Sequence, residues 1–198
     1  GIQSSSSNAS GVWFSGTNNV RVTNSTVWGS GSGSSAGVMF TAGQQNISAN
    51  STISGTTENN VAVVFSGGTQ TISNSTVQGA SSNAVAIAFT NGQQTLTANT
   101  TMTGSAANNV AVAFSGGAQT ISNSSAQGTS VSSSGLAITG GTQMVMGNSS
   151  IVGSSEQQVG LLIGAGASTC LSAKAGNGET VNFIGITSSS CSTIAGML

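Results

Sequence analysis

The amino-acid sequence predicts an all-β fold: a parallel β-solenoid, or β-helix, of about seven coils, each with 24–26 residues and three short strands. Two observations support this prediction. Large apolar residues recur at a nearly constant interval, and Asn, Gln and Gly residues recur at fixed distances from them. Because equivalent positions of successive coils meet in a solenoid, these repeats predict columns of like residues along a rod.

The first strand of each coil is predicted where a branched aliphatic residue precedes a larger apolar residue by two positions. Both side chains point to the same face of a strand, which we expect to be the core. The larger residues form the predicted core ladder: Phe14, Phe40, Phe65, Phe89, Phe114, Ile138 and Ile163. The aliphatic residues are Val12, Val38, Val63, Ile87, Val112, Leu136 and Leu161.

Two further apolar stations follow in each coil. The middle station lies seven residues after the core ladder, at Ile47, Ile72, Leu96, Ile121 and Val145. The third station lies five or six residues later, at Ile53, Val77, Met102, Ala126 and Ile151. Polar, Gly-containing turns separate the stations. We therefore expect a triangular coil whose strands stack at about 4.8 Å.

Three other residue types recur once per coil, and we interpret all three as structural. Stacked amides can hydrogen-bond between coils, and Gly suits a corner with positive φ. The predicted Asn ladder comprises Asn24, Asn50, Asn74, Asn99, Asn123 and Asn148. The Gly residues are Gly29, Gly55, Gly79, Gly104, Gly128 and Gly153. The Gln residues, at the turn before the middle strand, are Gln45, Gln70, Gln94, Gln119 and Gln143.

The Asn ladder also lies in N-x-[ST] sequences, so glycosylation is the competing interpretation. One glycan about every 4.8 Å would crowd its neighbours, and an amide turned inward would be inaccessible. We therefore expect the ladder to be unmodified. Asn8 and Asn46 lie in N-x-[ST] sequences outside the ladder and are candidate glycosylation sites.

Alternation along the first strand predicts an apolar outer face. Its candidate association residues are Trp13, Met39, Val64, Ala88, Ala113, Ala137 and Leu162. Small residues are expected on the same face, at Gly11, Gly37, Ala62, Ala86, Ala111, Gly135 and Gly160. Because soluble monomers rarely expose such a face, we expect either the C-terminal segment 165–198 or a neighbouring molecule to cover it.

The composition excludes most kinds of enzymatic catalysis and metal binding. Charged residues are 3% of the chain, the formal net charge is −1, and Asp and His are absent. The charged residues are Arg21, Lys174, Glu58, Glu156 and Glu179. This set predicts no enzyme activity, no metal site and no cofactor, and it is too poor in Lys and Arg for nucleic-acid binding. No apolar run approaches the roughly 18 residues of a membrane span.

Three segments are predicted: an N-terminal lead-in at 1–10, the solenoid at 11–164, and a non-repetitive cap or assembly segment at 165–198. Cys170 and Cys191 both lie in the last segment. They would pair in an exported protein and remain thiols in a reducing cytosol. We favour a disulfide, because the composition is otherwise typical of extracellular proteins. The chain begins without a signal peptide, so we expect a removed leader or a fragment.

The repeats at residues 11–164 resemble those of the right-handed, pectin-lyase-like parallel β-helices. In style they are closest to the Ser/Thr/Asn/Gly-rich stalks of bacterial surface adhesins, such as autotransporter passengers and filamentous haemagglutinin. The resemblance implies a right-handed β-helix in an exported protein. Lyases on this fold use acidic calcium ligands with an Arg or Lys base, and hydrolases use clustered Asp. Asp is absent here and Arg21 has no acidic neighbours, so the resemblance implies no enzymatic activity.

Two functions follow as expectations. The first is a secreted or cell-surface structural protein, a fibre subunit or adhesin stalk, that associates with itself through coil ends and the apolar face and contacts surface glycans or matrix. The second is a binding module for ice or glycans. Its recognition surface would be the outward residues of the middle strands, Thr71, Ser73, Thr95, Thr97, Thr120 and Ser122.

Overall fold

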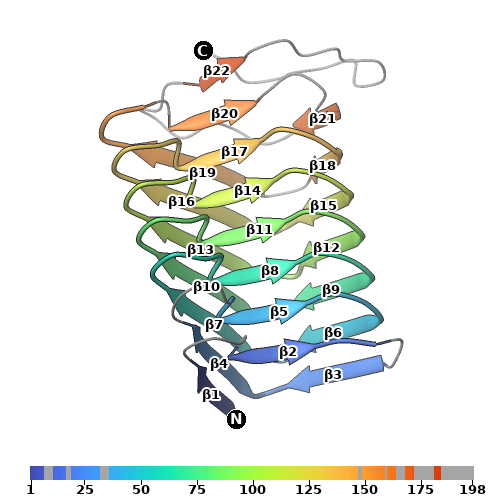
Figure 1. The fold of residues 1–198 in the computed structure, drawn as a ribbon. Helices are drawn as coiled ribbons and strands as arrows, with labels where there is room; N and C mark the ends of the chain where they lie inside the picture. Colours follow the sequence, from blue (N-terminus) through green and yellow to red (C-terminus); the bar gives the residue numbers. More distant parts are fainter. Residues whose placement is uncertain are drawn as a thin grey trace.

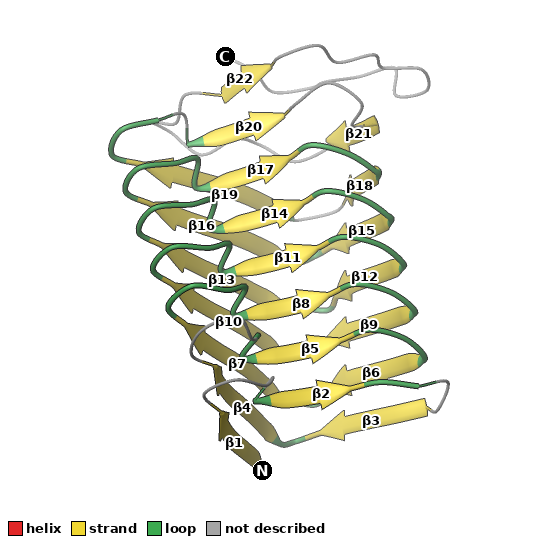
Figure 2. Cartoon of the chain, in the orientation of Figure 1, coloured by secondary structure: helices red, strands yellow, loops and turns green. Residues whose placement is uncertain are grey.

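The protein is a parallel β-solenoid with three sheets. The computed structural model describes residues 1–6, 11–16, 19–31, 36–146, 149–158, 160–163, 168–171 and 181–183. These residues form strands and turns, with no helix among them. Every strand pair that joins two coils is parallel, and short turns connect the strands (Figures 1 and 2).

The three sheets each take one strand from every coil. Sheet A contains β1 (Ile2–Ser6), β4 (Thr26–Gly31), β7 (Thr52–Thr57), β10 (Thr76–Ser81), β13 (Thr101–Ala106), β16 (Ser125–Ser130) and β19 (Ser150–Ser155). Sheet B contains β2 (Val12–Phe14), β5 (Val38–Phe40), β8 (Val63–Phe65), β11 (Ile87–Phe89), β14 (Val112–Phe114), β17 (Leu136–Ile138), β20 (Leu161–Ile163) and β22 (Val181–Phe183). Sheet C contains β3 (Asn19–Thr23), β6 (Gln44–Ser48), β9 (Thr69–Ser73), β12 (Gln93–Thr97), β15 (Ala118–Ser122), β18 (Thr142–Met146) and β21 (Ser168–Leu171).

Each coil runs through sheet B, then sheet C, then sheet A (Figure 1). The predicted fold class is confirmed, but the regular part is shorter than predicted. Residues 36–146, from β5 to β18, form an unbroken stretch of about five turns rather than seven. The first and last members of the predicted core ladder, Phe14 in β2 and Ile163 in β20, lie beyond this stretch, in strands that pair with its two ends.

Both ends of the described chain add strands to the sheets. β1 lies in the predicted lead-in, yet it pairs with β4, with Ile2 in register with Val27. β21 and β22 lie in the predicted non-repetitive segment, yet they extend sheets C and B. The described part of that segment therefore lengthens the solenoid and does not cover the outer face of sheet B.

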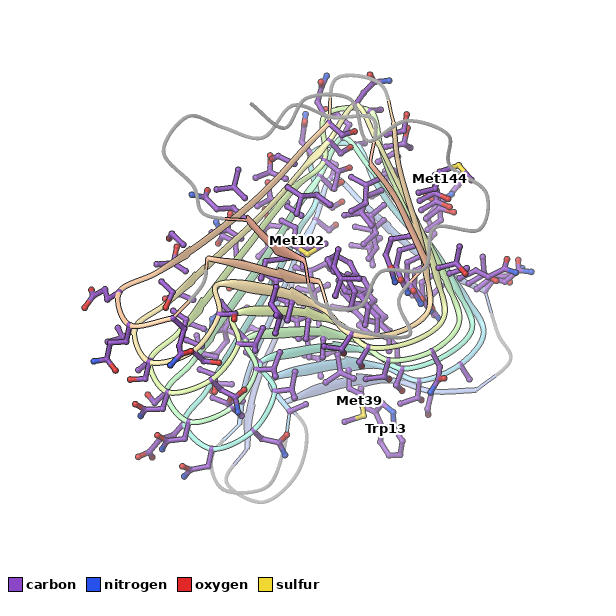
Figure 3. The ribbon with its side chains drawn as sticks, turned by 90° about the horizontal axis from the view of Figure 1, so that it is seen from above. Trp13, Met39, Met102 and Met144 are labelled. Carbon is purple, nitrogen blue, oxygen red and sulfur yellow. The ribbon has the colours of Figure 1, made fainter. Side chains whose placement is uncertain are left out.

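The core consists of columns of identical or similar side chains. The rings of Phe14, Phe40, Phe65, Phe89 and Phe114 stack with centroids 4.7–5.0 Å apart and interplanar angles of at most 13°. Aliphatic columns from sheets C and A complete the interior, and Met102 points into it (Figure 3). Burying these side chains is the main source of stability, because their apolar surface leaves water.

A buried column of Gln amides lines the turn between sheets B and C. Its members are Gln45, Gln70, Gln94, Gln119 and Gln143. From Gln70 onward, each Nε2 donates to the Oε1 of the preceding Gln, at 2.6–2.8 Å. All five Nε2 atoms also donate to the backbone carbonyl three residues earlier. The column therefore satisfies polar groups that would be costly to bury alone.

The recurring Gly column does not form the corner that the sequence predicted. Gly79 and Gly104 are buried inside the strands of sheet A, and neither has positive φ. A Cβ atom on Gly104 would lie 2.6 Å from the Ala111 carbonyl oxygen. Gly is required because sheet A approaches the backbone that enters sheet B too closely for any side chain. The Gly residues with positive φ lie between sheets B and C, for example Gly68 and Gly92.

Replacing one member of the Gln column tests its contribution. Gln94→Leu removes hydrogen bonds to Gln70, Gln119 and the Asn91 carbonyl, and it leaves the buried amides of Gln70 and Gln119 with one partner fewer. We expect the free energy of unfolding to fall by about 2–4 kcal/mol, measured by urea denaturation followed by circular dichroism. Gln93→Ala, at the exposed neighbouring position, should change it by less than about 0.5 kcal/mol. Equal effects would contradict the structural role of the column.

A second substitution tests the close approach between sheet A and the backbone that enters sheet B. Gly104→Ala forces the new methyl group against the Ala111 carbonyl, so sheet A must shift. We expect a loss of about 2–3 kcal/mol in the free energy of unfolding. The control is Ser105→Ala, which changes an exposed side chain in the same strand. Retention of full stability by the Gly104 variant would show that the two backbones can separate at little cost.

Candidate functional site

Three kinds of surface feature are the candidates for function. Among the described residues, no three His, Cys, Asp or Glu side chains gather as a metal site would require. Within the same residues, no helix is long and apolar enough to cross a membrane. The candidates are an apolar stripe, exposed Asn turns and rows of hydroxyl groups.

The apolar stripe follows the outer face of sheet B. Its members are Trp13, Met39, Val64, Ala88, Ala113, Ala137 and Leu162, which align through the registers of the sheet. Trp13 is 62% exposed, and its indole Nε1 donates to Thr41 Oγ1 at 3.1 Å. Trp13 and Met39 project side by side from this face (Figure 3). Met39, Val64 and Ala113 are half-buried, whereas Ala88 and Ala137 are buried.

The stripe is narrower than the sequence predicted. Of the seven small residues that alternation assigned to the outer face, six are buried, among them Ala62, Ala86 and Ala111, and Gly160 is half-buried. They precede the three-residue strands of sheet B and pack against the Gly column of sheet A. The error arose because the alternation was extended to residues before the start of each sheet B strand, where the chain arrives from sheet A. Each strand of sheet B thus contributes one side chain to the stripe, which is a single column.

The predicted Asn ladder forms the corner between sheets C and A, but its side chains face solvent. Asn24, Asn50, Asn74, Asn99 and Asn123 are exposed and have φ between 46° and 61°. Asn tolerates this left-handed conformation better than most residues do. Asn74 Nδ2 donates to Asn50 Oδ1 at 3.2 Å. The prediction of inward amides is therefore wrong, and only crowding between coils argues against their glycosylation. Asn148 and Asn8 lie outside the described residues.

The residue after each Asn is the one that faces inward at this corner. Ser51, Ser75, Thr100, Ser124 and Ser149 are buried. Ser51 Oγ donates to the Ser48 carbonyl at 2.6 Å and accepts from the Ser25 backbone N–H at 3.3 Å. A hydroxyl group suits this place because it is small and both donates and accepts. The invariable Ser or Thr after each ladder Asn was the sequence signal for this column, and it was missed.

An Asn ladder with repeated amide-to-amide bonds does occur, at the corner between sheets A and B. Asn83 Nδ2 donates to Asn59 Oδ1 at 2.7 Å, and Asn108 Nδ2 donates to Asn83 Oδ1 at 2.8 Å. These side chains are exposed. This column is not visible as a repeat in the sequence, because other coils carry different residues at the same corner.

Two outer faces carry rows of hydroxyl groups. On sheet C, Thr71, Thr95 and Thr120 align and are half-buried, and the row ends at Met144, which is 43% exposed. On sheet A a longer row, not predicted from the sequence, contains Thr26, Thr52, Thr76, Thr101 and Ser125. Its side chains are half-buried or exposed. The row on sheet A is therefore the more continuous of the two.

The remaining predicted sites can be placed only in part. Asn46 is exposed on the outer face of sheet C, in β6. Cys170 lies in β21, and Cys191 lies outside the described residues, so the disulfide stays a prediction.

The chain was compared with protein-family models, curated proteins and solved structures, and none of them matches it.

Proposed function

We propose that this protein is an extracellular structural protein, a fibre subunit or adhesin stalk that associates with copies of itself. The observation that carries the proposal is the apolar stripe of sheet B, in which Trp13 is exposed. A partly exposed Trp that also makes a hydrogen bond is typical of residues that dominate protein interfaces. A second copy would remove this apolar surface from water.

The small members of the stripe favour lateral packing. Ala88, Ala113 and Ala137 leave the middle of sheet B almost flat, so a facing sheet could approach closely. The near absence of charge removes the repulsion that usually keeps such faces apart. We also propose axial association between copies. A coil of one copy placed on a terminal coil of another would continue all three sheets.

The architecture suits a mechanical role. Columns of Phe rings and Gln amides connect each coil to the next through contacts that repeat along the rod. Such stacking resists local opening because each coil is held on both sides. The same proposal includes kinship with pectin-lyase-like β-helices or adhesin stalks and a secreted or cell-surface location. It also includes a Cys170–Cys191 disulfide, and surface glycans or matrix as further partners.

A double substitution in the stripe tests the self-association. Trp13→Ser with Met39→Ser removes one exposed and one half-buried side chain of the stripe without entering the core. We expect the dissociation constant of the assembly to rise at least about tenfold, since each buried side chain contributes about 1.5–3 kcal/mol. Analytical ultracentrifugation and negative-stain electron microscopy over a concentration series measure the effect.

The matched control is Met144→Ser, which removes an exposed apolar side chain from sheet C. This variant should assemble like the wild-type protein. Wild-type protein that sediments only as a monomer at high concentration would refute the proposal. Unchanged assembly of the double variant would exclude the stripe and leave the coil ends as the contact.

A second candidate function is favoured by the hydroxyl row of sheet A. Thr26, Thr52, Thr76 and Thr101 recur at the spacing of the strands, about 4.8 Å. A regular, uncharged row of hydroxyl groups could match a repeating polar surface, either ice or a crystalline glycan such as cellulose or chitin. This candidate replaces the sheet C row considered from the sequence, which is interrupted by Asn46 and Met144.

Substitutions on the two sheets separate this candidate from self-association. Thr76→Lys with Thr101→Lys places long charged side chains on the sheet A row, and Thr95→Lys with Thr97→Lys does the same on sheet C. If sheet A binds the surface, only the first pair should lower partition into ice or onto cellulose and chitin, by at least about tenfold, with assembly unchanged. Absence of partition by wild-type protein would refute the binding function and leave self-association untouched.

A further inference from the structure

The corner between sheets B and C contains one residue that differs from its counterparts along the rod. The registers of the following strands align Ala42, Gly67, Asn91, Gly116 and Gly140. A Cβ atom on Gly116 would lie 2.2 Å from a carbonyl oxygen of the preceding coil, and one on Gly140 would lie 2.7 Å from the equivalent oxygen. This corner therefore favours the smallest residues, and the stacking of coils does not explain Asn91.

The residue after Asn91 is Gly92, and the two form the one Asn-Gly pair among the residues that the structure describes. Gly92 has a φ of 85°, and its counterparts Gly68 and Gly117 also have positive φ. Gly is required at this position because a residue with a Cβ atom rarely adopts such a φ. The turn thus supplies the Gly, and the exceptional Asn before it completes the pair.

Both groups that react in an Asn-Gly pair are available. Asn91 is exposed, and Gly92 is half-buried. Neither the side-chain amide of Asn91 nor the backbone N–H of Gly92 makes a hydrogen bond to another described residue. The Gly92 nitrogen can therefore approach the Asn91 Cγ without breaking such a bond, and Gly92 has no side chain to obstruct the approach.

Other exposed Asn residues lack this combination. The Asn83 amide is held in its ladder, where it donates to the amide before it and accepts from the amide after it. Asn99 precedes Thr100, whose backbone N–H donates to Ser124 Oγ at 3.3 Å and whose branched side chain restricts the approach. These residues are controls within the same molecule.

We propose that Asn91–Gly92 is a self-modifying site, which converts to aspartate and isoaspartate as the protein ages. The Gly92 nitrogen loses its proton to hydroxide and attacks the Asn91 Cγ. The new N–Cγ bond closes a succinimide ring, and the Cγ–Nδ2 bond breaks to release ammonia. Water then opens the ring. Addition at Cγ gives aspartate, whereas addition at the former backbone carbonyl gives isoaspartate, in which the main chain runs through the side chain.

The products change the corner in two ways. Isoaspartate adds one methylene group to the main chain of a coil that is stacked between two others. The Asn91 carbonyl, which accepts from Gln94 Nε2 at 2.7 Å, becomes part of a free carboxylate off the main chain. Either product also adds an acidic group to a chain that has only three. The modification therefore weakens the Gln column with age, independently of any association between copies.

Peptide mapping by mass spectrometry tests the proposal on native protein that is sampled over weeks at neutral and alkaline pH. We expect Asn91 to convert at least about tenfold faster than Asn83 or Asn99 in the same sample, which needs only a small difference in activation barrier. The rate should rise with pH, because the deprotonated Gly92 nitrogen is the nucleophile. Isoaspartate should accompany aspartate at position 91, since water opens the ring at either carbonyl.

Hydroxylamine and one variant provide independent measurements. Hydroxylamine attacks the succinimide and cuts the chain after Asn91, and a cut at the second Asn-Gly pair, 177–178, gives fragments of different length. Asn91→Gly copies the residue of the adjacent coils and should resist the first cut. Aged wild-type protein should unfold at a lower urea concentration than fresh protein, whereas aged Asn91→Gly protein should match its own fresh sample.

Three results would overturn the proposal. Conversion of Asn91 no faster than that of Asn83 and Asn99 would show that the pair does not react in the folded protein. Aspartate without isoaspartate would show direct hydrolysis of the amide instead of ring closure. An unchanged urea midpoint after full conversion would show that the Gln column tolerates the longer main chain.

Discussion

Coils stack in register at the spacing of parallel β-strands, and this constraint governs the rest of the molecule. A side chain at any inward position contacts its counterparts one coil before and one coil after. Flat rings such as Phe65 and Phe89 satisfy this geometry by stacking. Amides such as Gln70 and Gln94 satisfy it by donating to one neighbour and accepting from the other. A residue that suits one coil therefore suits them all, which explains the repetition of the sequence.

The same constraint acts weakly on the outer faces, where side chains meet solvent. Each sheet consequently presents a different surface. Sheet B carries the apolar stripe, sheet A carries a continuous row of hydroxyl groups, and sheet C changes along the rod from Arg21 to Thr95 to Met144. The outer faces are therefore the best guide to function in this chain, because stacking requires no particular residue there.

Much of the architecture could be predicted because parallel stacking leaves a signal in the order of residues. The Phe ladder, the two other apolar columns and the Gln column were all visible as repeats, and the structure places them inside the solenoid. The errors occurred at the corners. Gly104 was assigned to a turn and Ala111 to an outer face, but they pack against each other at the corner between sheets A and B. Strand alternation cannot describe such a place, where the chain changes direction.

The sequence by itself determined that the chain repeats, how long each coil is and which side chains share a column, because these properties depend only on spacing. The tertiary structure alone decided how the columns face one another. It turned the ladder Asn residues outward and the following Ser or Thr residues inward, because the left-handed turn reverses which side chain points to the core. It also brought Arg21, Asn46 and Thr71 together, since residues one coil apart become neighbours only when the coils stack.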